Sequence, residues 1–340
     1  MTVLATADIR RLRYAPLTFW VWGGVLIAAG TVWKILKATG VKPWRLGFVR
    51  RLAEAFGGDA LWVSVPLALA AMTALGVAGA LGLHALTWSR YRLERTAEGG
   101  LTVRRGLSGK DAVSIAPDQL CGVALREPLL LRAGGGASVR AVAGGLGNRD
   151  QNRTRSVVLP PSPKAEAERV CAGVLGEGEG VDVAGLRGHP RAGLRRRVVA
   201  ALGWWVLPVV VVLAVLGWLL ALPVLLACAA GWALAVTPVA LILARDAYRG
   251  LGHAVRGRYL VVRSGTFGRE TVTLARNAVQ AWTFTDTPFA LRAGVVTLTA
   301  AVPGGEDGYR IRDMSAAEAA EFAEYAAPGI VREFLIDTDA

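Results

Sequence analysis

The sequence predicts a membrane protein in which α-helical hairpins alternate with α+β domains. Three observations carry this prediction: an uncharged run from Val198 to Ala244, two earlier apolar stretches, and a polar segment that occurs twice. One bilayer span needs about 20 apolar residues, so the uncharged run is long enough for two spans. Lipid offers no water to unpaired backbone groups, so we expect these stretches to be helical.

The two earlier stretches, Ala15 to Trp33 and Ala60 to Trp88, bring the expected number of transmembrane helices to four. We expect the turn of the second hairpin between Gly217 and Pro223. Most of the 11 Trp residues lie in or beside these stretches, which is typical of an aromatic belt, although Trp could also simply fill lipid-facing surface. Three small residues suit close helix packing, and an Ala- and Gly-rich genome would explain them equally well: Gly76, Gly79 and Gly82.

The N-terminus reads as an uncleaved anchor. Arg10, Arg11 and Arg13 precede the first apolar stretch, and no small-residue cleavage site follows it. The three cysteines are far apart and odd in number, so we expect neither a disulfide framework nor a zinc site.

A formal net charge of +13 would suit either nucleic acid or anionic lipid. The basic residues cluster at the helix ends, which favours a membrane surface and predicts no nucleic-acid partner. The predicted membrane-surface residues are Arg90, Arg92, Arg95, Arg191, Arg195, Arg196, Arg197, Arg245 and Arg249. By the positive-inside rule, both long polar segments then lie in the cytoplasm.

The segment between the first two helices, residues 34–59, conflicts with this orientation because it is also basic and would lie outside. Its part from Trp44 to Phe56 is predicted to be a short amphipathic helix on the membrane surface.

The polar segments repeat in one order. The aligned stretches are Gly100–Gly106 with Tyr259–Gly265, Leu107–Ile115 with Thr266–Leu274, and Pro128–Gly134 with Pro288–Gly294. The predicted organisation is a first hairpin with a basic connection (1–88), a first polar domain (89–176), a Gly-rich then Arg-rich linker (177–197), a second hairpin (198–244) and a second polar domain (245–337).

Each polar domain is predicted to be β-rich first and helical last. Alternating apolar residues indicate these strands: 101–105, 112–115, 119–125, 134–142 and 156–159, then 259–263, 271–274, 279–285, 294–301 and 309–311. Hairpin turns with a positive-φ glycine are expected at Ser108–Asp111 and Phe267–Glu270. A closing helix is expected after Ser162-Pro163, and another after the capping box that begins at Ser315.

These features resemble the bacterial membrane proteins with pleckstrin-homology-like (PH-like) domains, of the YdbS/YdbT type. The matching residues are Gly106 and Gly265, Gln119 and Gln280, Pro128 and Pro288, Arg132 and Arg292, and Gly134 and Gly294. The resemblance implies two repeated PH-like β-barrels, each of about seven strands and capped by one C-terminal helix. Longer family members carry three such domains, so a third could come from another chain.

The sequence offers little for catalysis. His84 is expected at a membrane boundary, and His189 and His253 lie among arginines and are expected to be solvated. Gly106 to Lys110 superficially resembles a phosphate loop but lacks its spacing, so we expect a turn there. No catalytic residue, cofactor site or metal site is predicted, and we expect no enzyme.

The function predicted from these observations is a non-enzymatic, multi-pass membrane scaffold. Its two PH-like domains would lie on the cytoplasmic face and bind anionic headgroups or a membrane protein, either of the same family or a second copy of the chain, with envelope stress or resistance to antimicrobial peptides as the setting. The alternative is a subunit of a small-solute exporter or permease. Helices with few ionisable residues argue against a solute path.

Overall fold

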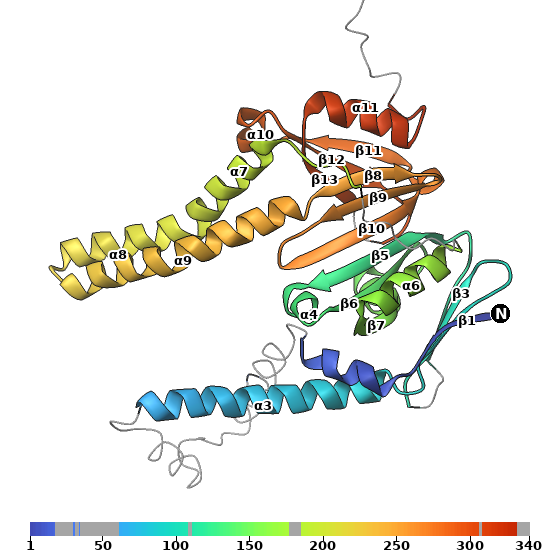
Figure 1. Cartoon of the computed structure of the whole chain (residues 1–340), viewed down its shortest axis with the longest axis horizontal. Helices are drawn as coiled ribbons and strands as arrows, with labels where there is room; N and C mark the ends of the chain where they lie inside the picture. The colour runs from blue at the N-terminus through green and yellow to red at the C-terminus, as the bar shows by residue number, and fades with distance from the viewer. Residues whose placement is uncertain are drawn as a thin grey trace, which may run out of the picture.

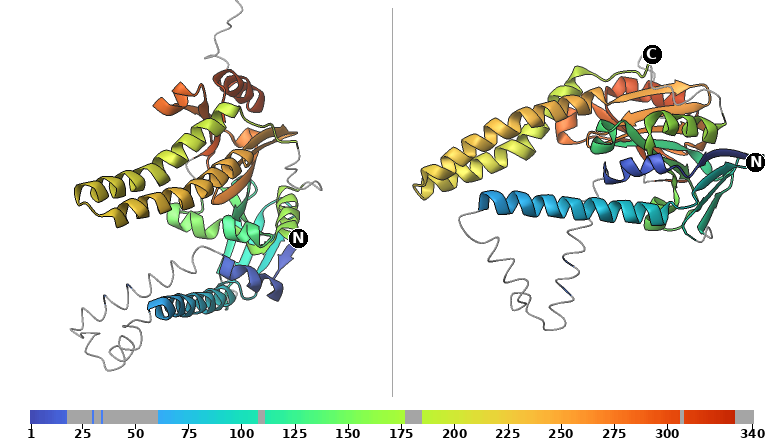
Figure 2. Two further views of the ribbon diagram at one scale, coloured as in Figure 1. Left: turned by 60° about the vertical axis from the view of Figure 1, so that its left-hand side comes forward. Right: turned by 60° about the horizontal axis from the view of Figure 1, so that its bottom comes forward.

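The computed structural model describes residues 1–17, 30, 34, 61–107, 111–176, 185–305 and 308–331. Long apolar helices leave one side of a β-rich body, as α3 (Leu61–Thr87) and the pair α8 (Leu207–Leu219) and α9 (Pro223–Arg249) (Figures 1 and 2). Most of the predicted span from Ala15 to Trp33 and all of the predicted helix from Trp44 to Phe56 lie outside the described residues.

Three helices in the described part of the chain are long and apolar enough to cross a membrane: Leu69–Thr87, Arg191–Leu219 and Pro223–Arg249. The second consists of α7 (Arg191–Ala201), a π-helical segment η3 (Leu202–Val206) and α8. The Arg-rich end of the predicted linker is therefore helical.

Proline accounts for the irregular segment. Pro208 has no N–H to donate to the preceding turn, and η3 lies directly before α8, which has a proline in its first turn. The indole Nε1 of Trp232 in α9 donates to the carbonyl oxygen of Trp205 at 3.2 Å. This bond satisfies a backbone acceptor inside the predicted membrane region, where water is absent.

The second hairpin turns where the sequence places it. Leu222 donates its N–H to the carbonyl of Gly217 at 2.9 Å, between the end of α8 and the start of α9. Gly217 is buried, and a Cβ at this position would meet the Leu226 side chain at 3.0 Å. Other apolar side chains of the hairpin face outward, with Trp218 77% and Leu234 79% exposed. Large exposed apolar surface of this kind fits lipid contact.

The first half contributes a four-stranded antiparallel sheet in the order β1-β2-β3-β4. Its strands are β1 (Thr2–Thr6), β2 (Arg92–Arg95), β3 (Leu101–Arg105) and β4 (Asp111–Ile115). Residues 2–6, where no strand was predicted, pair with β2. Before α3, residues Ile9–Leu17 form a 3₁₀ helix, η1.

A six-stranded antiparallel sheet joins the two halves in the order β7-β6-β5-β10-β9-β8. Its strands are β5 (Leu120–Pro128), β6 (Gly136–Ala143), β7 (Val157–Pro163), β8 (Gly252–Arg256), β9 (Tyr259–Ser264) and β10 (Gly268–Ala275). Strands β5 and β10 form the seam between the halves, paired from Gly268 opposite Pro128 to Leu274 opposite Gly122.

A three-stranded sheet completes the second half, with β11 (Ala281–Thr285), β12 (Val296–Ala301) and β13 (Tyr309–Met314). The helices of the β-rich body are α4 (Leu129–Ala133), α5 (Arg149–Arg155), α6 (Lys164–Leu175), α10 (Pro288–Arg292) and α11 (Ala316–Ala326), with a 3₁₀ turn η4 (Arg276–Ala278).

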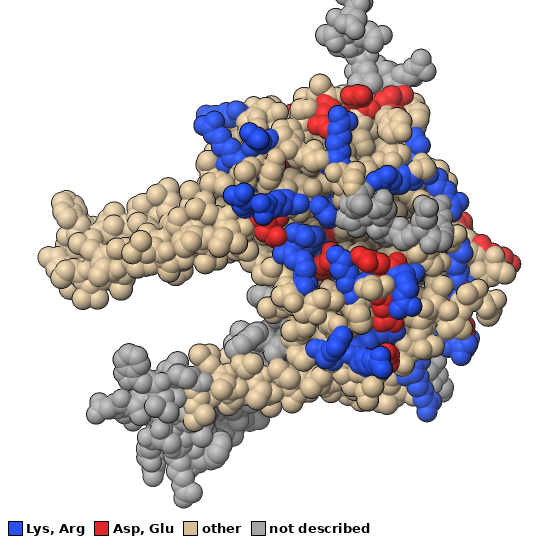
Figure 3. All heavy atoms as spheres, in the orientation of Figure 1, with Lys and Arg blue, Asp and Glu red and all other residues tan. Residues whose placement is uncertain are grey.

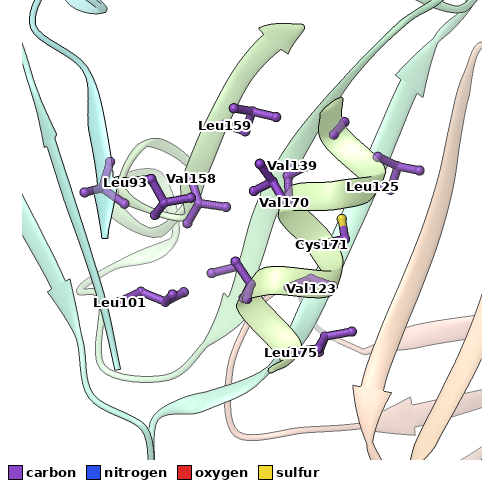
Figure 4. Packing of buried hydrophobic residues seen from close by; sticks show 14 of the residues in the cluster. Leu93, Leu101, Val123, Leu125, Val139, Val158, Leu159, Val170, Cys171 and Leu175 are labelled. Atoms are coloured by element: carbon purple, nitrogen blue, oxygen red, sulfur yellow. The ribbon is translucent and has the colours of Figure 1, made fainter. Parts of the chain in front are cut away.

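The six-stranded sheet contributes side chains to two hydrophobic cores. Along β9, Tyr259 and Val261 belong to the core that contains α6, while Leu260 and Val262 belong to the core of the second half. Successive residues of a strand point to opposite faces, so the sheet is covered on both faces. Figure 4 shows the first core, in which α6 packs against β5, β6 and β7.

Some local predictions are confirmed and others are wrong. Ser315 caps α11 by accepting the N–H of Glu318, as the capping box predicts. Ser162 does not cap α6, because it lies in β7 and its hydroxyl donates to the carbonyl of Pro160. Phe267–Glu270 is not the hairpin turn either. Gly265 supplies the positive φ (+106°), and β10 already begins at Gly268.

The alignment of Pro128 with Pro288 is one residue out of register with the structure, because α10 begins at Pro288 whereas α4 begins at Leu129. The positive-φ glycine that follows α4 is Gly135 (+70°), and the one that follows α10 is Gly294 (+66°). Gly294 therefore corresponds to Gly135 and not to Gly134, and Arg132 corresponds to Leu291 and not to Arg292.

Candidate membrane-facing surface and the seam between the halves

The surface where the helices meet the β-rich body carries most of the predicted basic residues. Figure 3 shows blue and red spheres over the body, whereas the described helical arms are uniformly tan. Arg191 and Arg195 on α7, and Arg245 and Arg249 on α9, are exposed near the ends of these helices. Such side chains can reach anionic headgroups, each contributing about 1 kcal/mol near the surface.

Two other predicted surface arginines bind a carboxylate instead. Arg196 and Arg197 both form ion pairs with Asp313, the latter from its Nη2 to Oδ2 at 2.8 Å. Asp313 is 1% exposed and has a left-handed backbone (φ +65°). Gly193 makes this approach possible, since a Cβ there would meet the Asp313 Cβ at 2.8 Å. This cluster fixes α7 against β13.

The predicted surface arginines that follow α3 in the first half differ in exposure and in partners. Arg90 and Arg92 are exposed, and the Nε of Arg92 lies 2.6 Å from Glu94. Arg95 is half-buried beside Gly176, at the end of α6.

The three glycines of α3 that were predicted to suit close helix packing differ in their surroundings. Gly76 is buried, whereas added Cβ atoms at Gly79 and Gly82 would meet no described neighbour.

A second carboxylate, at the end of a long apolar helix, connects the halves. Asp246, in the last turn of α9, accepts Nη2 of Arg132 from α4 at 2.8 Å and Nη2 of Arg269 from β10 at 2.9 Å. Arg132 belongs to the first half and α9 to the second, so this cluster holds the body to the hairpin. Arg132 belongs to the residues that carry the family resemblance, whereas Asp246 was not predicted as a site residue. The sequence signal for Asp246 is a single acidic residue at the end of a long apolar helix, between Arg245 and Arg249.

Side chains along the seam reinforce the backbone pairing. Arg126 donates from Nε to Glu270 at 2.7 Å across β5 and β10. The hydroxyl of Tyr259 donates to the carbonyl of Leu175 at 3.1 Å. Gly122 permits the closest approach, because an added Cβ would lie 2.1 Å from the carbonyl oxygen of Thr273. The seam is therefore a close-packed interface that tolerates little added volume.

His189 and His253 pack together, with His189 half-buried and His253 buried, contrary to the prediction that both are solvated. His253 is 1% exposed, and its Nδ1 lies 3.2 Å from Nε2 of His189. Burial, then the nearby His189 and Arg187, lower the pKa of His253 to about 3. Burial also lowers the pKa of His189. Both rings are therefore neutral near pH 7.

This histidine cluster holds the segment before α7 against the second half. The backbone of Arg187 pairs with that of His253, and its Nε lies 3.1 Å from Glu318 in α11. The Tyr248 hydroxyl donates to the carbonyl of His189 at 2.7 Å. The ring of His253 packs edge-on against Phe322 with centroids 4.6 Å apart. These contacts point to a structural role.

The described residues contain no group of three or more His, Cys, Asp or Glu that could hold a metal ion. Burial raises the pKa of the Cys171 thiol to about 12 and also raises that of Cys121, so both are protonated and unreactive. The largest cavity described, about 860 Å³, lies between the halves and is lined by residues such as Arg95, Tyr259 and Arg276.

Comparison with known proteins bears on the second half. Residues 197–329, from the end of α7 through α11, match the family model described as "Bacterial PH domain". No curated protein and no solved structure matched the chain. The antiparallel strands and closing helix of this region thus define a bacterial PH-like domain, a class of domain that generally binds and does not catalyse. Together with the three apolar helices, this indicates a membrane-associated binding protein.

Proposed function

We propose that this chain is a non-enzymatic, multi-pass membrane protein that presents two repeated PH-like units on the cytoplasmic face. There the units would bind anionic headgroups and a membrane-protein partner of the same kind. The observation that carries the proposal is the common direction of α3 and of the α8–α9 hairpin, which leave the same side of the body (Figure 1). Basic side chains gather where these helices meet it.

The two halves support a repeated unit through their matching element order. In each half, three antiparallel strands follow a long apolar helix, and a fourth strand, a short helix, two strands and a closing helix come next; the first half adds α5 between its last two strands. An envelope-stress or peptide-resistance setting stays a prediction. The exporter alternative has less support, because ionisable residues of α3, α8 and α9 lie only toward helix ends.

The amount of anionic lipid that the protein retains during purification tests headgroup binding. We expect the protein purified in mild detergent to retain anionic lipid, and a variant with Arg191, Arg195 and Arg249 changed to Ala to lose most of it. A matched control replaces three exposed arginines away from the ends of the apolar helices, Arg153, Arg169 and Arg256. Equal retention by both triple variants would remove headgroup binding from the proposal.

Orientation needs a separate measurement. With exposed Cys228 changed to Ser, a Thr154→Cys variant on α5 should react with a membrane-impermeant maleimide only after the cells are opened. Labelling of intact cells would place the body outside and contradict the cytoplasmic assignment.

A further inference from the structure

Among the outer strands of the three sheets, two correspond to the strands that form the seam, and their outer edges have no partner among the described residues. They are the outer edge of β4 in the four-stranded sheet and the outer edge of β11 in the three-stranded sheet. Unpaired edges present rows of backbone donors and acceptors and invite pairing with another strand. Four of the five residues of β11 are exposed.

The seam shows how such edges pair in this fold. Strand β10 occupies the position in the second half that β4 has in the first, since Leu260 lies opposite Leu274 as Leu101 lies opposite Ile115. Likewise Leu125 in β5 lies opposite Val139, and Phe284 in β11 lies opposite Leu298. The seam therefore joins a β5-type edge to a β10-type edge, and one edge of each type is left open.

Side chains next to the open edges can also be compared with those at the seam. In the seam, Arg132 binds Asp246, which lies six residues before the first residue of β8. The corresponding residues at the open edges are Leu291 in α10 and Leu86 in α3, six residues before β2. Leu291 is 62% exposed and Leu86 is 54% exposed. An ion pair within the chain is thus replaced by two exposed leucines.

Further apolar surface lies beside β11. Phe284 is 43% exposed and Phe289 is 70% exposed, whereas Leu125, which corresponds to Phe284, is fully buried. Beside β4, a cavity of about 730 Å³ lies between that strand and α5, lined by Ala112, Val113 and residues of α5. The β11 edge is therefore bordered by exposed apolar side chains, and the β4 edge by an open hollow.

We propose that the open β11 edge binds the open β4 edge of a second copy of this chain, antiparallel and in the register of the seam. Each copy would then use one edge of each type, so the contact is head-to-tail and links more than two copies. Because the apolar helices leave one side of the body, successive copies can share one membrane. This inference rests on the proposed membrane location and deepens its partner assignment.

The register gives a direct test. Thr271 lies opposite Leu125 in the seam, so Ala112 of one copy should lie opposite Phe284 of the next. In a Cys228→Ser background, mild oxidation of the Ala112→Cys/Phe284→Cys variant in membranes should produce a ladder of cross-linked species. The matched control, Ala112→Cys/Thr283→Cys, is shifted by one residue, which turns one thiol to the opposite face.

The ladder should exceed that of the control at least tenfold. No ladder, or equal ladders from both variants, would overturn the proposal. A product that stops at the dimer would also overturn the head-to-tail arrangement.

A second measurement avoids oxidation. Light scattering in detergent should give a mass above the monomer for the wild type, and Leu291→Arg should lower it. Adding Leu86→Asp would rebuild the arrangement of Arg132 and Asp246 and should restore the larger mass. A monomeric wild type would overturn the proposal, and so would an unchanged mass in the Leu291→Arg variant. Either result would remove self-association alone, because the membrane orientation and headgroup binding of the proposed function are tested separately by labelling and by lipid retention.

Discussion

Strands β5 and β11 occupy corresponding places in the two halves but differ in surroundings. Six of the nine residues of β5 are buried, whereas none of the five residues of β11 is buried. Both are paired on one side, with β6 and β12. The difference comes from the other side, where β10 covers β5. A neighbouring unit, more than the strand's own sequence, thus decides whether this edge is part of a core.

The largest expected loss of stability comes from adding side-chain volume at the seam. Gly122→Val would place a Cβ against the Thr273 carbonyl oxygen, which cannot move aside as a flexible side chain can. We expect a loss of roughly 3 to 4 kcal/mol in the free energy of unfolding of the β-rich body, measured by thermal or denaturant unfolding. Ala281→Val, at the corresponding exposed site of β11, should change it little. Similar losses at both sites would contradict the difference between the edges.

Removing Asp313 tests how the second half holds its helix. Asp313→Ala leaves Arg196 and Arg197 without their carboxylate, and we expect a cost of about 3 kcal/mol. In the first half, buried Arg11 pairs with Glu166 and also lies 5.3 Å from the centre of the Tyr91 ring. Glu166→Ala should therefore cost less. A larger loss for Glu166→Ala in the same unfolding assay would reverse this ranking.

Acidification should destabilise the second half through His253. Its pKa is about 3 in the folded chain, against an ordinary value near 6.5. Between these values the unfolded chain binds a proton that the folded chain does not, so stability falls as pH falls below about 6.5. At pH 5 the loss is about 2 kcal/mol. His253→Leu should flatten the pH dependence of the melting temperature, and an unchanged slope would exclude this histidine as the cause.

The smallest expected effect concerns the ion pair across the seam. Arg126 and Glu270 are each about one-quarter exposed, so solvent weakens their attraction. A double-mutant cycle with Arg126→Ala and Glu270→Ala should give a coupling energy of about 1 kcal/mol or less. Thr285→Ala, at the position of β11 that corresponds to Arg126, should show no coupling with Glu270→Ala. A coupling well above 1 kcal/mol would mean that the pair is more shielded than its exposure indicates.

Local patterns predicted the elements well where the governing interactions are local. Alternating apolar residues found β3, β9 and most other strands, and Ser315 with Glu318 marked the start of α11. The strand of residues 2–6 was missed because it pairs with β2, some 90 residues away, and its short sequence has no turn signal. Periodicity within a segment holds no information about such a distant partner.

The sequence predicted which residue types form the candidate site but not which of them are exposed and which form ion pairs. The sequence located the arginines but could not distinguish exposed Arg195 from Arg196, which binds Asp313, because the difference depends on how α7 meets β13. The prediction that His189 and His253 are solvated was wrong for a similar reason. His253 alternates into the core from β8, and only the neighbouring strand and helix enclose it.

The β5–β10 seam also constrains the order in which this protein can be made. Strands β5 to β7 leave the ribosome well before β10, which lies beyond the entire second hairpin. Until β10 has been synthesised, β5 lacks the neighbour that shields its small apolar side chains. The nascent chain therefore passes through an intermediate in which the edge of β5 is open, and a delay before β10 is made would prolong its exposure to aggregation.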